Sequence, residues 1–239
     1  MNKIIVGGDS FSDKNQPQYA MPEPLDFKMW PEIVGEKLHC EVINTARSGY
    51  GNHAIYHKTL EAIMNNKDVS HVFVMWSQWT RQDFLVNSNR EYVSINTWEG
   101  LYRWGRDVKT YQDVENTLIE KWYDDSFSKN FPIQNNSASI PSMEQYTNTN
   151  INYIYALKVI CKKYNIQYIS CQGTDTCIWP PSLITQHPLG NEAYKGFSMA
   201  ELLTKEYGKD GYITSDVDNH PNEVSQKFIA NKMLDYANE

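Results

Sequence analysis

Five short stretches of the sequence are almost continuously apolar, β-branched or aromatic, and each is bounded by turn residues. They lie at 3–7, 41–45, 70–76, 166–171 and 211–214. Strands that are buried on both faces have this near-continuous pattern, whereas half-exposed strands alternate between apolar and polar positions. The pattern therefore predicts five buried strands.

Between these stretches, apolar residues recur at the three-to-four-residue spacing of an amphipathic helix. The segments with this spacing are 28–38, 52–65, 150–164 and 223–237. Strands that alternate with helices form parallel sheets, because each right-handed crossover returns the chain to the same edge. The sequence therefore predicts an α/β fold with a parallel, doubly wound sheet, built as a single domain that spans 1–239.

One stretch, from about residue 81 to 146, has no clear period and is rich in Asn, Ser, Tyr and Trp. Five of the seven tryptophans lie between Trp76 and Trp122. Structureless loops of this length are uncommon inside a compact domain. We therefore predict a partly helical insertion after the third strand, lying over one edge of the sheet.

The composition narrows the class of protein. Apolar residues make up 41% and charged residues 21%, which is typical of a soluble globular protein. The formal net charge of −7 argues against a nucleic-acid partner, which needs clustered positive charge. No run of 18 apolar residues is present, so no membrane span is predicted. The first residues are too short an apolar run for a signal peptide, and the four cysteines lack zinc-type spacing, so we expect a cytoplasmic protein with free thiols.

The first candidate for chemistry is the turn Gly-Gly-Asp-Ser-Phe-Ser at 7–12, where the first predicted strand ends. Ligands of open parallel sheets bind at the carboxyl ends of the strands. Ser10 would open the following helical turn, whose backbone N–H groups favour a developing negative charge. Ser10 is therefore a candidate nucleophile, although a Gly-Asp-Ser turn that only caps a helix fits the same residues.

The second candidate is Asp-Val-Asp-Asn-His-Pro-Asn at 216–222, between the last predicted strand and the C-terminal helix. His220 in this segment lies at the same end of the sheet as Ser10. A nearby carboxylate would accept its Nδ1–H and leave Nε2 facing the serine. A plain turn with helix-capping Asp and Asn residues is the alternative interpretation.

The chain order Ser…Asp…His, with Ser10 after the first strand and the Asp/His pair before the last helix, resembles the SGNH hydrolase (GDSL-like esterase and lipase) superfamily. The resemblance covers nearly the whole chain apart from the insertion. It implies a flavodoxin-like three-layer α/β/α sandwich with a five-stranded parallel sheet in the order 2-1-3-4-5. It also implies an acyl-serine mechanism with Ser10 as nucleophile and His220 as base.

The family's oxyanion hole is matched in part. Gly49, within 44–52, fits the position whose backbone N–H joins that of Ser10 in the hole, although glycine also suits a flexible turn. The third block departs from the family, because Trp-Ser-Gln at 76–78 stands where Gly-x-Asn is usual. Gln78 carries the same amide on a side chain one methylene longer, so it is either the third donor or a solvent-facing loop residue.

The catalytic acid also departs from the usual pattern. The common family spacing is Asp-x-x-His, but residue 217 is Val. Asp218, two residues before His220, matches an Asp-x-His variant found in some SGNH-like enzymes, including enzymes that act on acetyl groups of polysaccharides. We therefore predict Asp218 as the triad acid of a divergent member, with Asp216 as the alternative.

Substrate-binding residues are expected around the same strand ends. Arg81 would hold a carboxylate of the site or of the substrate, although a surface salt bridge is an alternative. Aromatic rings of the insertion suit stacking on sugars but serve equally well as core. The predicted substrate-binding residues are Asp9, Asn52, Trp79, Arg81, Trp98 and Trp104, with Tyr102 as a further wall of the cleft.

The sequence thus predicts a serine esterase that removes small acyl groups, such as acetyl, from a small molecule or a glycan. No nucleotide or flavin fingerprint is present, so no cofactor is expected. His53 and His57 lie four residues apart but lack a third ligand in register, so no metal site is expected. The alternatives are a catalytically decayed scaffold that binds glycan or protein, and an O-acyltransferase. The oligomeric state does not follow from the sequence.

Overall fold

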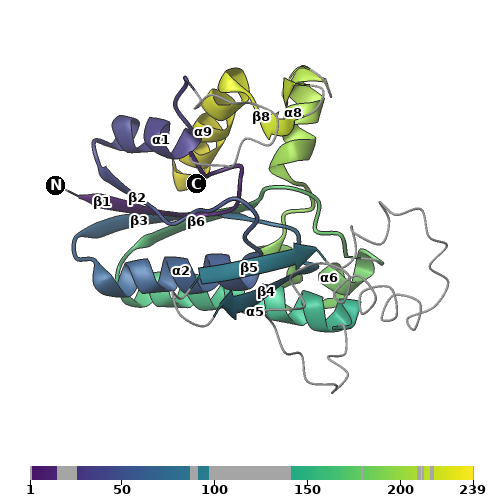
Figure 1. Ribbon diagram of the computed structural model, residues 1–239. Coiled ribbons are helices and arrows are strands. Elements are labelled where there is room, and N and C mark those ends of the chain that lie inside the picture. The colour runs from purple at the N-terminus through teal and green to yellow at the C-terminus, as the bar shows by residue number, and fades with distance from the viewer. Residues whose placement is uncertain are drawn as a thin grey trace.

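A four-stranded parallel sheet forms the centre of the computed structural model, with helices on both of its faces (Figure 1). Its strands are β1 (Lys3–Gly7), β2 (Glu41–Asn44), β3 (Val69–Trp76) and β6 (Gln167–Gln172), in the order β2-β1-β3-β6. The structure describes residues 2–14, 26–86, 91–96, 141–178, 180–208, 211, 213–215 and 218–238.

Two helix layers bury the two faces of this sheet. Helices α2 (Asn52–Asn65) and α5 (Met143–Lys163) cover one face, and α1 (Trp30–Leu38) and α9 (Glu223–Asn238) cover the other (Figure 1). Along β1, Ile5 packs towards α2 and α5, whereas Ile4 and Val6 pack towards α1 and α9. Because both faces are buried, the consecutive positions Ile4, Ile5 and Val6 are all apolar. The predicted α/β/α sandwich is confirmed.

Several short elements complete the described fold. Helices α6 (Ser182–Gln186), α7 (Gly190–Ala193) and α8 (Met199–Tyr207) follow β6. Strands β4 (Arg81–Val86) and β5 (Glu91–Asn96) form an antiparallel hairpin after β3, and β7 (Ile213–Ser215) pairs antiparallel with β8 (Asp218–Pro221). The three helices and the two antiparallel pairings were not predicted from the sequence.

The predicted fifth strand of the sheet is wrong. Ile213 lies opposite Pro221, and Ser215 lies opposite Asp218, so this segment forms a separate antiparallel pair. The sheet described by the structure therefore has four strands in the order 2-1-3-4. A short apolar run does not distinguish a central parallel strand from one arm of a hairpin, since both bury the same kind of residue.

Helix α5 begins at Met143, seven residues before the predicted start at 150. Ser142 caps it, because its side chain accepts a hydrogen bond from the N–H of Gln145, and the Gln145 side chain accepts one from the N–H of Ser142. The first turns also bury the polar residues Thr147 and Asn150. These polar residues on the buried face hide the helical period from a hydrophobicity pattern.

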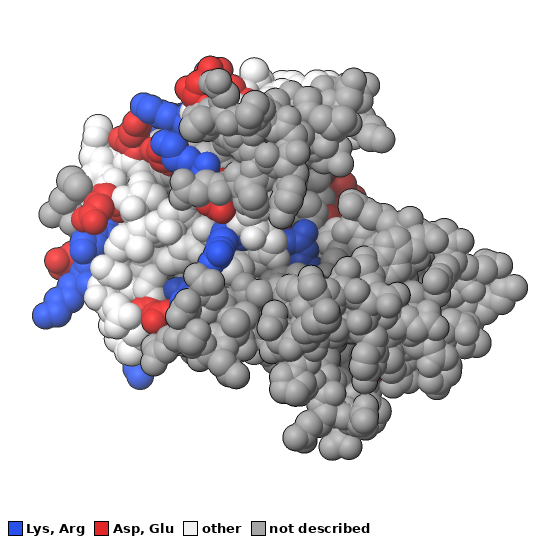
Figure 2. Space-filling model, viewed as in Figure 1, with Lys and Arg blue, Asp and Glu red and all other residues white. Residues whose placement is uncertain are grey.

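The insertion predicted at about 81–146 is described only at its two ends, as the β4–β5 hairpin and the start of α5. Trp98, Tyr102 and Trp104 lie outside the described residues. On the face shown in Figure 2, acidic and basic side chains of the described residues are interspersed. In the part of the chain that the structure describes, no helix is long and apolar enough to cross a membrane.

Candidate active site

Ser10 lies in a tight turn at the carboxyl end of β1. The Ser12 N–H donates to the Asp9 carbonyl oxygen at 3.0 Å, and the Phe11 N–H donates to the Asp9 carboxylate at 3.1 Å. Position 8 must be glycine, because a Cβ there would lie 2.4 Å from the Ser12 hydroxyl oxygen. Ser10 itself is only 9% exposed. The local sequence thus folds back sharply and presents Ser10 at the edge of the sheet.

The loop after β2 is hydrogen-bonded to the Ser10 turn. The Arg47 N–H donates to the Gly8 carbonyl at 3.3 Å, and the Ser48 N–H donates to the Asp13 carboxylate at 2.8 Å. Gly49 follows with a φ of +87°, a backbone conformation that residues with a side chain rarely adopt. Among the described residues, neither the Ser10 N–H nor the Gly49 N–H has an acceptor. Both groups therefore have donor capacity for a ligand oxygen.

The loop after β3 is held by a buried side-chain amide. The Ser77 N–H donates to Asn52 Oδ1 at 2.7 Å, and Asn52 Nδ2 donates back to the Ser77 carbonyl at 3.0 Å. Gln172 Nε2, at the end of β6, donates to the same carbonyl at 2.7 Å. The backbone next to Gln78 is therefore fixed from both α2 and β6.

The same network accounts for two predicted substrate-binding residues. Asn52 is 2% exposed, and its Nδ2 also donates to Asn150 Oδ1 at 2.7 Å. Trp79 is fully buried, its indole N–H donates to Gln172 Oε1 at 2.9 Å, and its ring packs edge-on against Tyr194. Both side chains are engaged inside the protein. Trp79, expected to wall the cleft, and Asn52, expected to bind substrate, are thus both buried in this structure, where they hold the loop in place.

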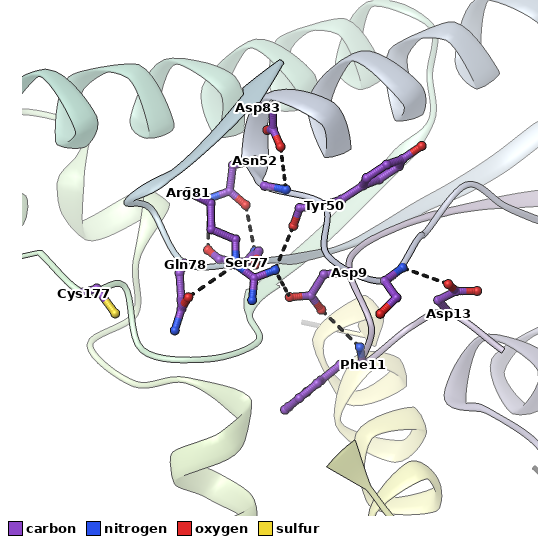
Figure 3. A network of polar contacts seen from close by, with 12 residues as sticks. Asp9, Phe11, Asp13, Tyr50, Asn52, Ser77, Gln78, Arg81, Asp83 and Cys177 are labelled. Carbon is purple, nitrogen blue, oxygen red and sulfur yellow. Dashed lines mark hydrogen bonds and ion pairs between the residues drawn. The ribbon is translucent and has the colours of Figure 1, made fainter. Parts of the chain in front are cut away.

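Arg81 joins three loops at this edge of the sheet (Figure 3). Its Nε–H donates to Gln78 Oε1 at 3.3 Å, and an Nη1–H donates to the Tyr50 carbonyl at 3.2 Å. The same nitrogen lies 3.7 Å from Asp9 Oδ2, whose side chain is 3% exposed. The prediction that Arg81 holds a carboxylate within the site agrees with this ion pair. Asp9, predicted to bind substrate, is instead buried as the partner of Arg81.

Asp83 is a positioning residue that the sequence did not reveal. Its carboxylate accepts hydrogen bonds from the Gly51 N–H at 2.8 Å and the Ala54 N–H at 2.9 Å (Figure 3). It therefore caps α2, whose own N-cap residue, Gly51, has no side chain. Capping residues normally lie within the local sequence, so no pattern pointed to a carboxylate 32 residues away.

His220, on β8, lies beside the Ser10 turn. Its ring packs edge-on against Phe11, with 6.0 Å between the ring centroids. In the described residues the Ser10 hydroxyl has no hydrogen-bond partner, so the expected Ser10–His220 hydrogen bond is not formed in this structure. Asp216, the Asp218 side chain, Trp98 and Trp104 lie outside what is described.

The two histidines that could suggest a metal form a pair on α2. The His53 and His57 rings lie 4.5 Å apart, and burial lowers the pKa of both. The described ranges contain no group of three or more His, Cys, Asp or Glu residues that could hold a metal ion. The polar groups near the Ser10 turn in the described residues include a serine hydroxyl, an imidazole, two backbone N–H groups and a side-chain amide.

Comparisons with known proteins find similarity only at the level of structure. No family model matches the chain, and no curated protein sequence matches it. The esterase EstA from Pseudoalteromonas sp. is 13% identical over 100% of this chain and 97% of its own, with a TM-score of 0.45. A GDSL-like lipase from Parabacteroides merdae is 12% identical over 100% of this chain and 97% of its own, with a TM-score of 0.46.

The acetyl xylan esterase Est2A from the rumen bacterium Butyrivibrio proteoclasticus is 10% identical over 98% of this chain and 63% of its own, with a TM-score of 0.43. The chain is therefore similar to GDSL-type lipases and esterases at low identity. Similarity of this degree does not carry an activity from one protein to another.

Proposed function

We propose that the chain is a serine-dependent ester hydrolase in which Ser10 forms an acyl-serine intermediate. One observation carries the proposal: the Ser10 turn is bonded to the Gly49 loop and packs through Phe11 against His220, all at the carboxyl edge of one parallel sheet. These segments are far apart in the sequence. Their meeting supplies a nucleophile, a base and oxyanion donors in one place.

In this mechanism His220 Nε2 takes the proton of the Ser10 hydroxyl as its oxygen attacks the ester carbonyl. The carbonyl oxygen gains negative charge in the tetrahedral intermediate. His220 then protonates the leaving alcohol, and a water molecule, deprotonated by His220, releases the acid. The proton transfer requires Nε2 and the hydroxyl oxygen to come within about 3 Å. The His220 ring must therefore approach Ser10 when substrate binds.

The oxyanion would be held by the Ser10 N–H, the Gly49 N–H and the Gln78 amide. The first two lack acceptors among the described residues, which supports this role. Gln78 is 9% exposed and its oxygen is bonded to Arg81, so its nitrogen points elsewhere. Each such donor contributes about 10²- to 10³-fold to turnover in enzymes that use one.

Asp218 is the proposed partner of His220 Nδ1. Its position two residues before His220 matches the Asp-x-His variant of the resembling family, which supports Asp218 as the acid that orients the imidazole. Asp216 is the alternative.

For the substrate, we propose a small acyl ester, such as an acetyl group on a glycan, bound with help from Trp98 and Trp104. The aromatic-rich composition of the insertion supports this, because flat rings with polar edges stack on sugars. An O-acyltransferase would use the same acyl-serine and a sugar hydroxyl in place of water. A decayed scaffold would bind the glycan without forming the acyl-serine.

Hydrolysis of p-nitrophenyl acetate by the wild-type protein and by Ser10→Ala tests the proposal. We expect hydrolysis that Ser10→Ala abolishes and that Ser182→Ala, a change at an exposed serine of α6, leaves unchanged. A wild-type rate no higher than that of Ser10→Ala would favour the decayed scaffold. Added sugar acceptors that divert the acyl group from water would favour the transferase.

A further inference from the structure

The amide of Gln78 has two orientations that fill nearly the same space. Its oxygen only accepts hydrogen bonds and its nitrogen only donates them. An oxyanion accepts hydrogen bonds, so only the orientation that turns Nε2 towards it is useful. A glutamine also has one more rotatable bond than the asparagine usual at this position in the resembling family. Something must therefore select one orientation of Gln78 if its amide serves as an oxyanion donor.

Arg81 has the chemistry to make that selection. A guanidinium carries five N–H donors and no acceptor, so only the oxygen end of an amide bonds to it. Arg81 Nε–H donates to Gln78 Oε1 at 3.3 Å. In Figure 3 the Gln78 oxygen faces Arg81 and the amide nitrogen points away from it. Reversing the amide would place two N–H groups against the guanidinium, which is unfavourable.

The guanidinium is itself held by the other two loops of the site. Its Nη1 is 3.7 Å from Asp9 Oδ2 in the Ser10 turn and donates to the Tyr50 carbonyl in the Gly49 loop at 3.2 Å. Asp9 also accepts the Phe11 N–H, so its carboxylate is fixed in turn. The Arg81 side chain is 19% exposed, which limits competition from water. Through these two contacts of Arg81, the orientation of the Gln78 amide is fixed relative to the Ser10 turn and to the Gly49 loop.

We propose that Arg81 is a positioning residue that locks the Gln78 amide with its N–H groups directed at the oxyanion. The proposal rests on the proposed esterase function and deepens it. It explains how glutamine can replace asparagine here, because the guanidinium removes the freedom that the longer side chain adds. Arg81 acts through Gln78 and does not touch the substrate.

A double-mutant cycle on p-nitrophenyl acetate tests this role, using the wild type, Gln78→Ala, Arg81→Lys and the double variant. We expect Gln78→Ala to lower kcat about 10²-fold. Lysine keeps the positive charge beside Asp9 but loses the planar fork, so Arg81→Lys should lower kcat about 10-fold with KM nearly unchanged. In the Gln78→Ala background, Arg81→Lys should lower kcat less than about twofold, because the amide it orients is absent.

A second variant, Asp9→Asn, removes the negative charge that holds the Arg81 guanidinium and leaves Arg81 itself unchanged. It should lower kcat about threefold to 10-fold alone and add nothing to Gln78→Ala. Lys158→Met, which removes a surface ion pair with Glu192, is the matched control for loss of a charge and should leave kcat unchanged. Melting temperatures of all variants identify any loss that comes from unfolding.

The outcomes separate this inference from the proposed function. One outcome is that hydrolysis depends on Ser10 while the double variant loses kcat by the product of the two single losses. Arg81 then acts independently of Gln78, and its proposed positioning role is wrong. If KM rises instead of kcat falling, Arg81 binds substrate directly and the positioning role is also wrong. If hydrolysis survives Ser10→Ala, the proposed function fails, and the positioning role fails with it.

Discussion

The two sides of the proposed site differ in how firmly they are held. On the nucleophile side, the three loops that carry Ser10, Gly49 and Gln78 are bonded to one another and to α2, α5 and β6. On the base side, His220 lies on β8, which in the described residues pairs with the short β7 through two residue pairs and a shift of register, and whose Pro221 carbonyl accepts a hydrogen bond from Gln226. The loops of the nucleophile side follow strands of the parallel sheet, whereas His220 lies on a strand outside that sheet.

This difference indicates which side moves during catalysis. The oxyanion donors must be in place before charge develops, because reorganising them during the reaction would raise the barrier. A base only has to reach the hydroxyl when substrate is present. Among the described residues the Ser10 hydroxyl has no hydrogen-bond partner and β8 pairs apart from the parallel sheet, and both observations agree with this division. We therefore expect the base side to close on a rigid nucleophile side.

The largest expected effect is the loss of the nucleophile or the base. Ser10→Ala and His220→Ala should each lower kcat by about 10⁴-fold or more, since each removes an essential group. Ser10→Ala should not lower the melting temperature much, because no hydrogen bond of Ser10 is lost within the described structure. A large drop in melting temperature for Ser10→Ala would contradict the finding that Ser10 makes no hydrogen bond within the described structure. The control is Ser182→Ala.

The second-largest loss of kcat is expected at the catalytic acid. Asp218→Ala should lower kcat about 10³-fold or more, because only the carboxylate bonded to Nδ1 orients the imidazole. Asp216→Ala should retain most of the activity. Steady-state kinetics of the two variants, measured side by side, decide the assignment. If Asp216→Ala is the inactive variant, Asp216 and not Asp218 is the triad acid.

Variants on the two sides should also differ in how far they lower the free energy of unfolding, although this difference is smaller than the differences in kcat. Asn52→Ala removes a buried amide from both Ser77 and Asn150, so it should lower the free energy of unfolding by about 2–3 kcal/mol. Asn222→Ala, on the base side, removes the side chain that accepts the Ser225 N–H and caps α9, which should cost about 1 kcal/mol. Denaturant unfolding measures both. Equal losses would mean that the base side is held as firmly as the other.

The smallest effect is a pH dependence of stability on the nucleophile side. Burial lowers the pKa of His53, and the neighbouring His57 lowers it further. The unfolded chain then binds a proton more readily than the folded one between that lowered pKa and the ordinary histidine value of about 6.5. Stability should therefore fall as pH drops through this window. His53→Gln should make the melting temperature less sensitive to pH between 7 and 5, and an unchanged slope would rule out this histidine.

Local patterns account for what the sequence predicted correctly. The parallel strands β1, β2, β3 and β6 contain short apolar runs and the helix α2 has a helical period, so their positions were predictable. Ser10 and His220 became candidates because each follows a stretch that the sequence predicts as a strand. Whether their side chains meet depends on β8, whose pairing with β7 the apolar pattern did not indicate.

What the sequence could not show depends on contacts between distant residues. Arg81 bonds Asp9, Tyr50 and Gln78, which belong to three different loops, and no spacing along the chain encodes that meeting. Trp79 was expected in a cleft because aromatic rings suit both cores and sugar sites. Its burial follows from the position of Gln172, 93 residues later. Tertiary packing, and not local preference, decided both outcomes.

The most direct test of the proposed function is a crystal structure of the protein after reaction with a serine-reactive phosphonate. We expect phosphorus bonded to the Ser10 hydroxyl oxygen, with its phosphonyl oxygen about 3 Å from the Gly49 nitrogen and from Gln78 Nε2. The loops of the nucleophile side should be unchanged, and His220 Nε2 should lie within about 3.5 Å of the Ser10 oxygen. No adduct at Ser10, or an adduct in which His220 lies more than about 8 Å from it, would contradict a serine esterase built on these two residues.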